Sequence, residues 1–436
     1  MTDKLAAIIN ADQANSWYRH SLETAFSSTS APVNTQTKVC VVGAGFAGLA
    51  AATGLHERGF DDVVVVEAGE VGHGASGRNG GFIFGGYSLS PQALVRQQGV
   101  FRAREMYQLT TTAVELIRQR VAQYQLDCQF HDAGVMLADW FDRPDKLHKE
   151  MQFMNQSMGA NWEFVPRSQL CRQLETDRYY DGLLETDAAH FHPLAYATGL
   201  AKVLDNAGIP VWQHCPVTSI QRDGNRWCVK AGEVEVIADQ VVLACGGYQQ
   251  ILKAKPRQAI LPISTYIMVT ERLPELLPKL IRPAWAVYDT RFAFDYYRPL
   301  PDQRLLWGGR ITVRDPDVKT IEKRLRADMA RVFPALANVK ADYVWSGLMG
   351  YPRHEMPMIG ESEPGLWHLT GFGGHGVAPT TAIGDLLAAA ISENDKRYQW
   401  FKQYDLKSVF GAAGLIAAQL NYWYLQTRDY WRDPQR

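Results

Sequence analysis

Clusters of glycine carry the strongest chemical signal in this sequence, because glycine lets a backbone approach a ligand closely. The first cluster is Gly43-Ala44-Gly45-Phe46-Ala47-Gly48, which follows a β-branched run and precedes a helical pattern. In this GxGxxG spacing Gly43 permits a tight turn, Gly45 admits a pyrophosphate, and Gly48 allows the helix to pack closely on the strand. The N–H groups at the start of that helix, near Phe46 and Ala47, present a positive dipole end to phosphates.

An acidic residue ends the next predicted strand. Residues 62–66 have strand composition, and Glu67 follows them, nineteen residues beyond Gly48, with Ala68 after it. A carboxylate at this place accepts hydrogen bonds from both ribose hydroxyls and disfavours a 2′-phosphate, so NADP is not expected. The strand–turn–helix–strand–Glu order therefore predicts a dinucleotide site, although NAD and FAD share this fingerprint.

A second glycine cluster follows at once. Residues 70–81 contain five glycines in twelve positions, which suits a loop lying against a flat ligand or, alternatively, an exposed linker. With its string GASGRNGG, the chain resembles the flavin amine oxidases of the D-amino-acid oxidase and glycine oxidase superfamily, and most closely their γ-glutamylputrescine oxidase-like branch. By that resemblance the following residues lie along the ribityl chain and ring of FAD: Ala75, Ser76, Arg78, Asn79, Gly80 and Gly81.

Two later segments extend the resemblance. A predicted strand at 239–244 ends on Cys245-Gly246-Gly247, and residues 371–376 match the family's GFxGHG motif before a helical pattern. The resemblance places Cys245, Gly246 and Gly247 near the cofactor, although an ordinary strand-to-turn junction is the alternative, and it places Val217 near the adenine. It also assigns to the flavin pyrimidine edge the residues Gly374, His375, Gly376, Val377 and Ala378. We expect His375 to contact the cofactor rather than to transfer protons, but it stays a catalytic candidate.

The chain departs from the family at two positions. Some members tether flavin to a Cys before the C-terminal motif, and residues 345–351 hold none, so noncovalent FAD is expected. Many members that oxidise amino acids clamp the substrate carboxylate with an Arg, and that position falls at or near Met349. A thioether cannot pair with a carboxylate, which disfavours α-amino acids unless Arg353 takes the role.

Aromatic residues are the remaining candidates for substrate contact. Tyr266, Tyr296 and Tyr297 lie in predicted strands, and either pocket lining or core packing explains them. Successive strand residues face opposite sides, so only one of Tyr296 and Tyr297 should face the flavin. Aromatic faces hold an ammonium group on entry and exclude water afterwards.

These features favour an FAD-dependent oxidase or dehydrogenase acting on a CH–NH bond. The expected substrate is a primary or secondary amine resembling γ-glutamylputrescine, in polyamine catabolism, with hydride transfer to flavin N5, imine hydrolysis and H₂O₂ formation. O₂ or another acceptor would reoxidise the flavin. An oxidase of a D-amino acid, sarcosine or pipecolate is the alternative within enzymes. A non-catalytic flavoprotein and a nicotinamide-linked dehydrogenase are further alternatives.

The elements that must position these residues come from separated stretches. We predict an α/β (α+β) fold, with a Rossmann-like FAD-binding domain of the glutathione-reductase-like type and a discontinuous β-rich substrate domain. The FAD-binding domain takes residues 1–95, 191–255 and 347–392, and the substrate domain takes 96–190 and 256–346. Residues 393–436 form a C-terminal helical tail.

Composition limits the remaining possibilities. The 436 residues carry 45 Lys+Arg against 46 Asp+Glu, so a nucleic-acid partner is not expected. The six cysteines form no CxxC pair, so we predict no metal site and free thiols in a reducing compartment. Residues 1–10 lack the features of a signal peptide, and we expect a cytoplasmic protein. Residues 410–425 are apolar and uncharged, which suits a packed helix, an oligomer interface or, less favoured, a membrane contact.

Overall fold

The parallel core of the first sheet brings the predicted dinucleotide elements to one edge. The computed structural model describes residues 15–248, 254–312 and 317–435, so residues 1–10, considered above for targeting, lie outside the described residues. The strand order is β17-β18-β11-β1-β2-β8, and β9 and β10 extend from β11. Val42 of β1 is in register with Val66 of β2 and Leu243 of β11, so these three strands end together. The turns that follow them therefore meet at the same carboxyl edge.

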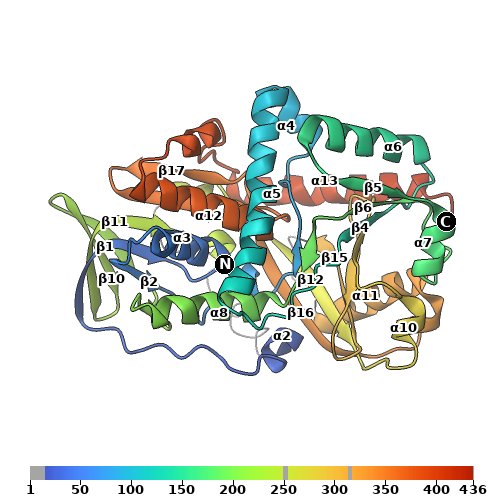
Figure 1. The fold of residues 1–436 in the computed structure, drawn as a ribbon, viewed down its shortest axis with the longest axis horizontal. Helices are drawn as coiled ribbons and strands as arrows, with labels where there is room; N and C mark the ends of the chain where they lie inside the picture. The colour runs from blue at the N-terminus through green and yellow to red at the C-terminus, as the bar shows by residue number, and fades with distance from the viewer. Residues whose placement is uncertain (1–14, 249–253, 313–316, 436) are drawn as a thin grey trace.

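The strands of this sheet have the following bounds: β1 Asn34–Val42, β2 Val63–Val66, β8 Val211–Trp212, β9 Ser219–Asp223, β10 Arg226–Ala231, β11 Val234–Leu243, β17 Met358–Glu363 and β18 Leu366–Thr370. β2 is four consecutive buried valines, as expected for a parallel strand covered on both faces. Helices α3 (Phe46–Glu57) and α12 (Val377–Ser392) pack against each other beside the sheet (Figure 1). A Cβ on Gly384 would lie 2.7 Å from that of Ala50, so glycine permits this close approach.

The second sheet has the order β16-β12-β15-β14-β13-β4-β6-β5. Its strands are β4 Val135–Ala138, β5 Trp162–Val165, β6 Gly182–Glu185, β12 Leu261–Thr270, β13 Ala286–Asp289, β14 Tyr296–Pro299, β15 Leu305–Thr312 and β16 Ala341–Tyr351. One face packs on helix α11 (Val318–Val332) through an apolar cluster that includes Trp307 and Leu325. Side chains on its other face line a cavity.

The remaining elements cover and connect the sheets. Figure 1 shows α5 (Val100–Gln123) crossing between the first sheet and the second. The other α-helices and strands of the described residues are α2 Trp17–His20, β3 Phe82–Ile83, α4 Pro91–Gln98, α6 Pro144–Phe153, α7 Arg167–Gln173, β7 Ala189–His190, α8 Pro193–Asn206, α9 Ala254–Gln258, α10 Leu277–Leu280 and α13 Gly411–Arg432. The predicted α/β class with a Rossmann-like sheet is confirmed. The predicted segment boundary between residues 346 and 347 falls inside β16, which pairs with β12 as far as Tyr351.

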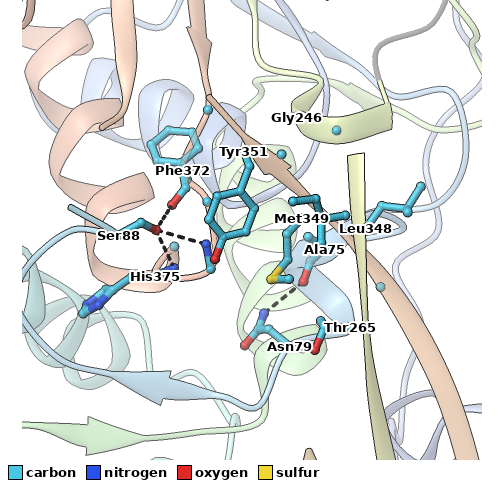
Figure 2. A pocket seen from close by; sticks show the side chains of 18 of the residues that line it. Ala75, Asn79, Ser88, Gly246, Thr265, Leu348, Met349, Tyr351, Phe372 and His375 are labelled. Atoms are coloured by element: carbon cyan, nitrogen blue, oxygen red, sulfur yellow. Dashed lines mark hydrogen bonds between the residues drawn. The ribbon is translucent and has the colours of Figure 1, made fainter. Parts of the chain in front are cut away.

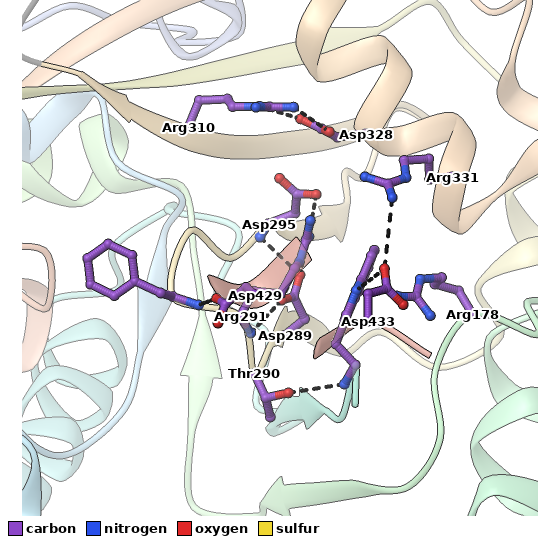
Figure 3. A network of polar contacts seen from close by, with 12 residues as sticks. Arg178, Asp289, Thr290, Arg291, Asp295, Arg310, Asp328, Arg331, Asp429 and Asp433 are labelled. Carbon is purple, nitrogen blue, oxygen red and sulfur yellow. Dashed lines mark hydrogen bonds and ion pairs between the residues drawn. The ribbon is translucent and has the colours of Figure 1, made fainter. Parts of the chain in front are cut away.

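Helix α13 is the C-terminal tail, and buried polar contacts attach it to the second sheet. Asp429 accepts a hydrogen bond from the backbone N–H of Phe292 at 2.6 Å, and Asp433, just beyond the helix, pairs with Arg178 at 2.6 Å (Figure 3). Helix α13 also exposes several large apolar and aromatic side chains: Ile416, Leu420, Trp423, Tyr424, Tyr430 and Trp431. The tail is thus a packed surface helix rather than a buried one. Across the described residues, helices with the length and apolar character needed to cross a membrane are absent.

Candidate functional site

A cavity of about 1550 Å³ lies between the carboxyl edge of the first sheet and the inner face of the second. Typical sites for one small ligand measure about 300–1,000 Å³, so this cavity has room for a dinucleotide and a substrate together. The GxGxxG turn and Glu67 line one part of it, and the GFGGHG loop and an aromatic wall line another. The motifs that are far apart in the sequence therefore border one continuous space.

The dinucleotide part of the cavity depends on close backbone approach. Gly43 has φ +112°, and a Cβ there would lie 2.8 Å from the Ala244 carbonyl oxygen. A Cβ on Gly48 would overlap the Gly43 carbonyl oxygen, so helix α3 can start this close to β1 only with glycine there. The N–H of Phe46 donates to Ser76 Oγ at 2.8 Å, which brings the start of α3 and the 70–81 loop together.

Glu67 is held by backbone amides at the end of β2. Its Oε2 accepts from the N–H of Ala44 at 2.8 Å and its Oε1 accepts from the N–H of Gly69 at 2.9 Å. Burial raises the pKa of the carboxyl group, and these hydrogen bonds oppose that effect. The two amides fix the orientation of the carboxylate where it lines the cavity. This geometry suits an acceptor of ribose hydroxyls.

Side chains of the 70–81 loop brace the loop itself. Arg78 is buried, and its Nε donates to the His73 carbonyl at 2.9 Å. Asn79 donates to the Ser76 carbonyl at 2.8 Å and accepts from the N–H of Gly81 at 2.8 Å. The side chains of Arg78 and Asn79 therefore fix the conformation of the loop backbone that lines the cavity.

Arg298, which the sequence did not single out, ties this loop to the second sheet. It lies in β14 with 0% of its surface exposed. Its Nε donates to the Gly80 carbonyl at 2.8 Å, and its Nη2 donates to the Phe191 carbonyl at 2.8 Å. Its charge also helps to lower the pKa of the buried His190 and His192 to about 3, an effect mainly caused by burial. No local motif marks Arg298, because its acceptors come from distant parts of the chain.

Ser88 organises the C-terminal glycine loop. Its Oγ accepts hydrogen bonds from the N–H groups of Gly374 at 3.1 Å and His375 at 3.3 Å. The same hydroxyl donates to the Phe372 carbonyl at 3.3 Å, and Figure 2 shows Ser88 between Phe372 and His375. Helix α12 begins immediately afterwards at Val377, and the N–H groups of its first turn lack intrahelical acceptors. This end of the helix borders the cavity and suits a ligand with partial negative charge.

His375 is a neutral imidazole in this environment. Its ring packs on Phe84, with centroids 4.1 Å apart, and burial lowers its pKa to about 4. Its Nε2 lies 3.1 Å from the Phe84 carbonyl oxygen, which assigns the ring proton to Nε2. A neutral ring used in this way suits cofactor contact better than proton transfer.

We expect the Ser88→Ala substitution to weaken cofactor retention about tenfold, which corresponds to about 1.4 kcal/mol. The change removes the acceptor shared by the amides of Gly374 and His375. The measurement is the flavin released on dilution of the purified protein. The control is Ser90→Ala, whose hydroxyl caps α4 through the N–H of Ala93 and lies outside the cavity lining. Equal flavin loss in the two variants would contradict a specific role for Ser88.

Most predicted site residues line the cavity. They are Gly43, Gly45, Phe46, Ala47, Glu67, Ala68, Ala75, Ser76, Arg78, Asn79, Gly80, Val217, Cys245, Gly246, Gly247, Tyr296, Gly374, His375, Gly376 and Val377. Three others, Gly48, Gly81 and Ala378, lie outside the lining and in close packing instead. A Cβ on Gly81, for example, would overlap the Phe191 carbonyl oxygen. These three residues support the cavity wall through their packing and do not border the cavity themselves.

The structure places two of the three candidate tyrosines in the core and one at the cavity, so of the two open readings core packing holds for Tyr266 and Tyr297. Tyr297 is fully buried and stacks on Trp307 with centroids 4.6 Å apart, and Tyr266 lies in the same apolar cluster, so neither lines the cavity. The reason is strand alternation: on β12 the neighbouring Thr265 faces the cavity, and on β14 Tyr296 does. The ring of Tyr296 lies against Gly80 and Gly308, where any Cβ would meet it.

A substrate carboxylate would need an available arginine in the cavity lining, so the partners of the lining arginines are relevant. Met349 lines the cavity close to Gly374. Arg353 also lines it, with its guanidinium 5.6 Å from the ring centroid of Phe410. Two further arginines of the lining are already paired: Arg291 with Asp289 and Asp295, and Arg310 with Asp328 (Figure 3). Buried carboxylates thus neutralise these two guanidinium groups.

Aromatic rings form a wall on the inner face of the second sheet. Tyr288 and Tyr296 are directly paired on β13 and β14. Phe84 stacks on Tyr288 with centroids 5.5 Å apart, and Phe294 lies 5.9 Å from the same ring. Phe82 contacts Tyr296 at 5.6 Å. All five rings line the cavity, and Phe84 joins the wall to His375.

Comparison with known proteins agrees with this arrangement. The DAO family, described as FAD dependent oxidoreductase, matches residues 38–390. The chain is 33% identical to gamma-glutamylputrescine oxidoreductase of Escherichia coli, over 83% of this chain and 85% of that protein. It is 31% identical to the probable oxidoreductase OrdL of Haemophilus influenzae, over 90% of this chain and 92% of that protein.

A solved structure shares the fold. Glycine oxidase from Bacillus cereus superposes with a TM-score of 0.70 at 18% identity, covering 84% of this chain and 97% of that one. The predicted resemblance is thereby confirmed at the level of the family, and the match spans the turn after β1, the 70–81 loop and most of α12. The chain belongs to the DAO family of FAD-dependent oxidoreductases.

Proposed function

We propose that this protein oxidises a CH–NH bond of a primary or secondary amine, with FAD bound noncovalently. The observation that carries the proposal is the aromatic wall facing the GFGGHG loop, together with Met349 beside Gly374. Its relatives include a protein named gamma-glutamylputrescine oxidoreductase, which makes γ-glutamylated amines the first substrates to test.

The residues present fit FAD. The Gly43 turn leaves space where a side chain would meet Ala244, Glu67 presents an oriented carboxylate, and the start of α12 borders the same cavity. Cys245 lines the dinucleotide part, and burial raises the pKa of its thiol to about 12, so it is a poor nucleophile. Strand β16 brings Leu348 and Met349 to the cavity and no cysteine, which supports noncovalent binding.

Bound FAD would supply the two-electron acceptor for the oxidation, and the protein would position and desolvate the amine. The aromatic wall lowers the local polarity, which favours the neutral form of a substrate nitrogen over the ammonium form. Tyr296, hydrogen-bonded to Thr265, remains a neutral phenol because burial raises its pKa. His375 stays uncharged beside Phe84. The site therefore favours removal of hydride from an uncharged amine without an acid–base side chain.

Oxidation of an α-amino or α-imino acid is the second candidate, and Arg353 is the observation that favours it. Arg353 lines the cavity, and its cation could receive a carboxylate. The paired Arg291 and Arg310 are less suited to that role, because each already binds a carboxylate.

Anaerobic flavin reduction distinguishes these proposals. We expect γ-glutamylputrescine and related amines to bleach the flavin absorbance, whereas D-amino acids, sarcosine and pipecolate should do so at least about 100-fold more slowly. Admission of air followed by an H₂O₂ assay then tests whether oxygen is the acceptor. Bleaching by amino acids alone would overturn the amine proposal, and no bleaching across the panel would favour a non-catalytic flavoprotein.

The adjacent tyrosines provide a matched control for this assay. Tyr296→Phe alters a cavity residue, and Tyr297→Phe removes the same hydroxyl on the opposite, core-facing side of β14. Slower bleaching in the Tyr296 variant alone would support a substrate site at the aromatic wall.

A further inference from the structure

Glu185 is a buried acidic residue at the far end of the aromatic wall. It is the last residue of β6, it lines the cavity, and only 5% of its surface is exposed. Its strand neighbours are Trp162 on β5 and Val135 on β4. Buried carboxyl groups are rare unless they are paired, so the partners of Glu185 decide what it can do.

The hydrogen bonds of Glu185 come from neutral donors. The Tyr288 hydroxyl donates to its Oε1 at 3.1 Å, and the Trp162 indole donates to the same carboxyl group. Within the described part of the chain, none of the ion pairs includes Glu185. A carboxylate offers about four acceptor positions, so two donors leave capacity for a cationic ligand. Burial raises the pKa of the group to about 8.

The surroundings of Glu185 suit an ammonium ion rather than an anion. Four aromatic rings of the cavity lining surround it: Trp162 and Tyr288 donate to Glu185, Tyr107 lies close enough for the Glu185 charge to act on its hydroxyl, and Phe84 stacks on Tyr288. Glu150 of α6 also lines the cavity and adds a second negative charge, with its two oxygens accepting from Gln92 at 2.7 and 2.8 Å. Aromatic faces and carboxylates attract cations together, most strongly where water is excluded.

A continuous path of rings joins this acidic pocket to the predicted flavin contacts. His375 packs on Phe84 at 4.1 Å, Phe84 stacks on Tyr288 at 5.5 Å, and Tyr288 bonds Glu185. The aromatic wall therefore connects His375 to Glu185, and a molecule that lies along it has the predicted flavin contacts at one end and the Glu185 carboxyl group at the other.

We propose that Glu185 and the rings around it bind a second, non-reacting ammonium group of the substrate, so that the protein selects amines with two cationic ends. This rests on the proposed amine oxidation, because the other end of the molecule must lie at the flavin. A diamine has the required chemistry, and an amine that carries an α-amino acid end offers the second ammonium group together with a carboxylate. A simple alkylamine lacks the second charge and leaves Glu185 without a cation.

The subsite has an expected pH dependence. With a pKa of about 8, Glu185 is largely protonated below that pH and ionised above it, so the affinity for a second ammonium should rise as the pH is raised through 8. The facing titratable groups are Tyr288 on β13, Tyr107 on α5, Glu150 on α6 and Asp187 after β6. Burial raises the pKa of both tyrosines, so they stay neutral over this range.

The test compares 1,5-diaminopentane with 1-aminopentane on the FAD-loaded protein. Binding is measured by anaerobic stopped flow, from the change in flavin absorbance that precedes any bleaching. At pH 8.5 we expect the diamine to bind at least about tenfold more tightly than the monoamine. Glu185→Gln, which retains the size of the side chain, should reduce that ratio to about twofold and remove its rise between pH 7 and 8.5.

Glu355→Gln is the matched control, because it removes an acidic side chain from the cavity lining that is not part of the Glu185 subsite. It should retain most of the preference for the diamine. An equal loss in both variants would mean that overall charge, rather than a Glu185 subsite, sets the preference. A wild-type ratio near one would also overturn the proposal. Failure of amine oxidation is distinguishable, since it abolishes bleaching but leaves the binding ratio measurable.

Discussion

The Arg298→Met variant should lose most of its bound FAD and unfold at lower denaturant concentration. Methionine keeps an apolar chain of similar length but removes the donors to the carbonyls of Gly80 and Phe191. Each buried acceptor left without a partner costs about 1–3 kcal/mol, so the pair together gives about 2–6 kcal/mol. Removal of a buried charge offsets part of this cost. The measurements are the flavin-to-protein ratio and the midpoint of urea unfolding.

Two further variants test the cause of this loss. Arg298→Lys retains the positive charge but not the planar fork that reaches two carbonyls, so it should restore little of the flavin content. Arg304→Met removes an arginine just before β15 whose partners, Asp302 and Asp342, lie outside the cavity lining, and it should retain FAD. Full flavin content in the methionine variant of Arg298 would show that the 70–81 loop holds its shape without this anchor.

Gly48→Ala should prevent assembly of the dinucleotide site. In most helix interiors alanine stabilises by about 1 kcal/mol relative to glycine. Here the added Cβ would overlap the Gly43 carbonyl oxygen and lie 3.2 Å from Val41 Cγ1, so α3 must move away from β1. A backbone overlap of this kind belongs with the rare substitutions that cost more than about 4 kcal/mol. We expect insoluble or flavin-free protein, measured by soluble yield and absorbance.

Gly59→Ala is the control for loss of a glycine. This residue lies just after α3 at φ +71°, with no atom within 4 Å of the added Cβ. The left-handed backbone costs alanine about 1–2 kcal/mol, and the site itself is untouched. The Gly59 variant should therefore fold and bind FAD. Normal flavin content in the Gly48 variant would contradict the packing role of that glycine.

The dinucleotide elements were predictable because their signals are local. The glycines of the turn after β1, the valines of β2 and the acidic residue that follows lie within one short stretch of chain. Each of these residue types is required by backbone geometry at its own position. The same holds for the GFGGHG loop before α12, and the family resemblance that these motifs carry is confirmed.

For the candidate tyrosines, the sequence could not predict which face of the second sheet borders the cavity. Alternation required Tyr296 and Tyr297 to face opposite sides, but it did not reveal which side was the cavity. That choice depends on α11 covering one face of the second sheet, beneath Tyr297 and Tyr266. Because Tyr297 and Tyr266 are buried on the face that α11 covers, the residues on the other face, Tyr296, Tyr288 and Thr265, line the cavity.

By itself the sequence determined the family, the Rossmann-like class and most of the segments that line the cavity, since short-range spacing encodes turns, strands and helix starts. Only the tertiary structure showed two long-range hydrogen bonds of the site. Ser88 accepts from the N–H of Gly374, 286 residues away, and Arg298 donates to the carbonyl of Gly80, 218 residues away. It also placed Glu185 at the end of the aromatic wall. A hydrogen bond or a shift in pKa depends on which groups meet after folding, and distance along the chain does not contain that information.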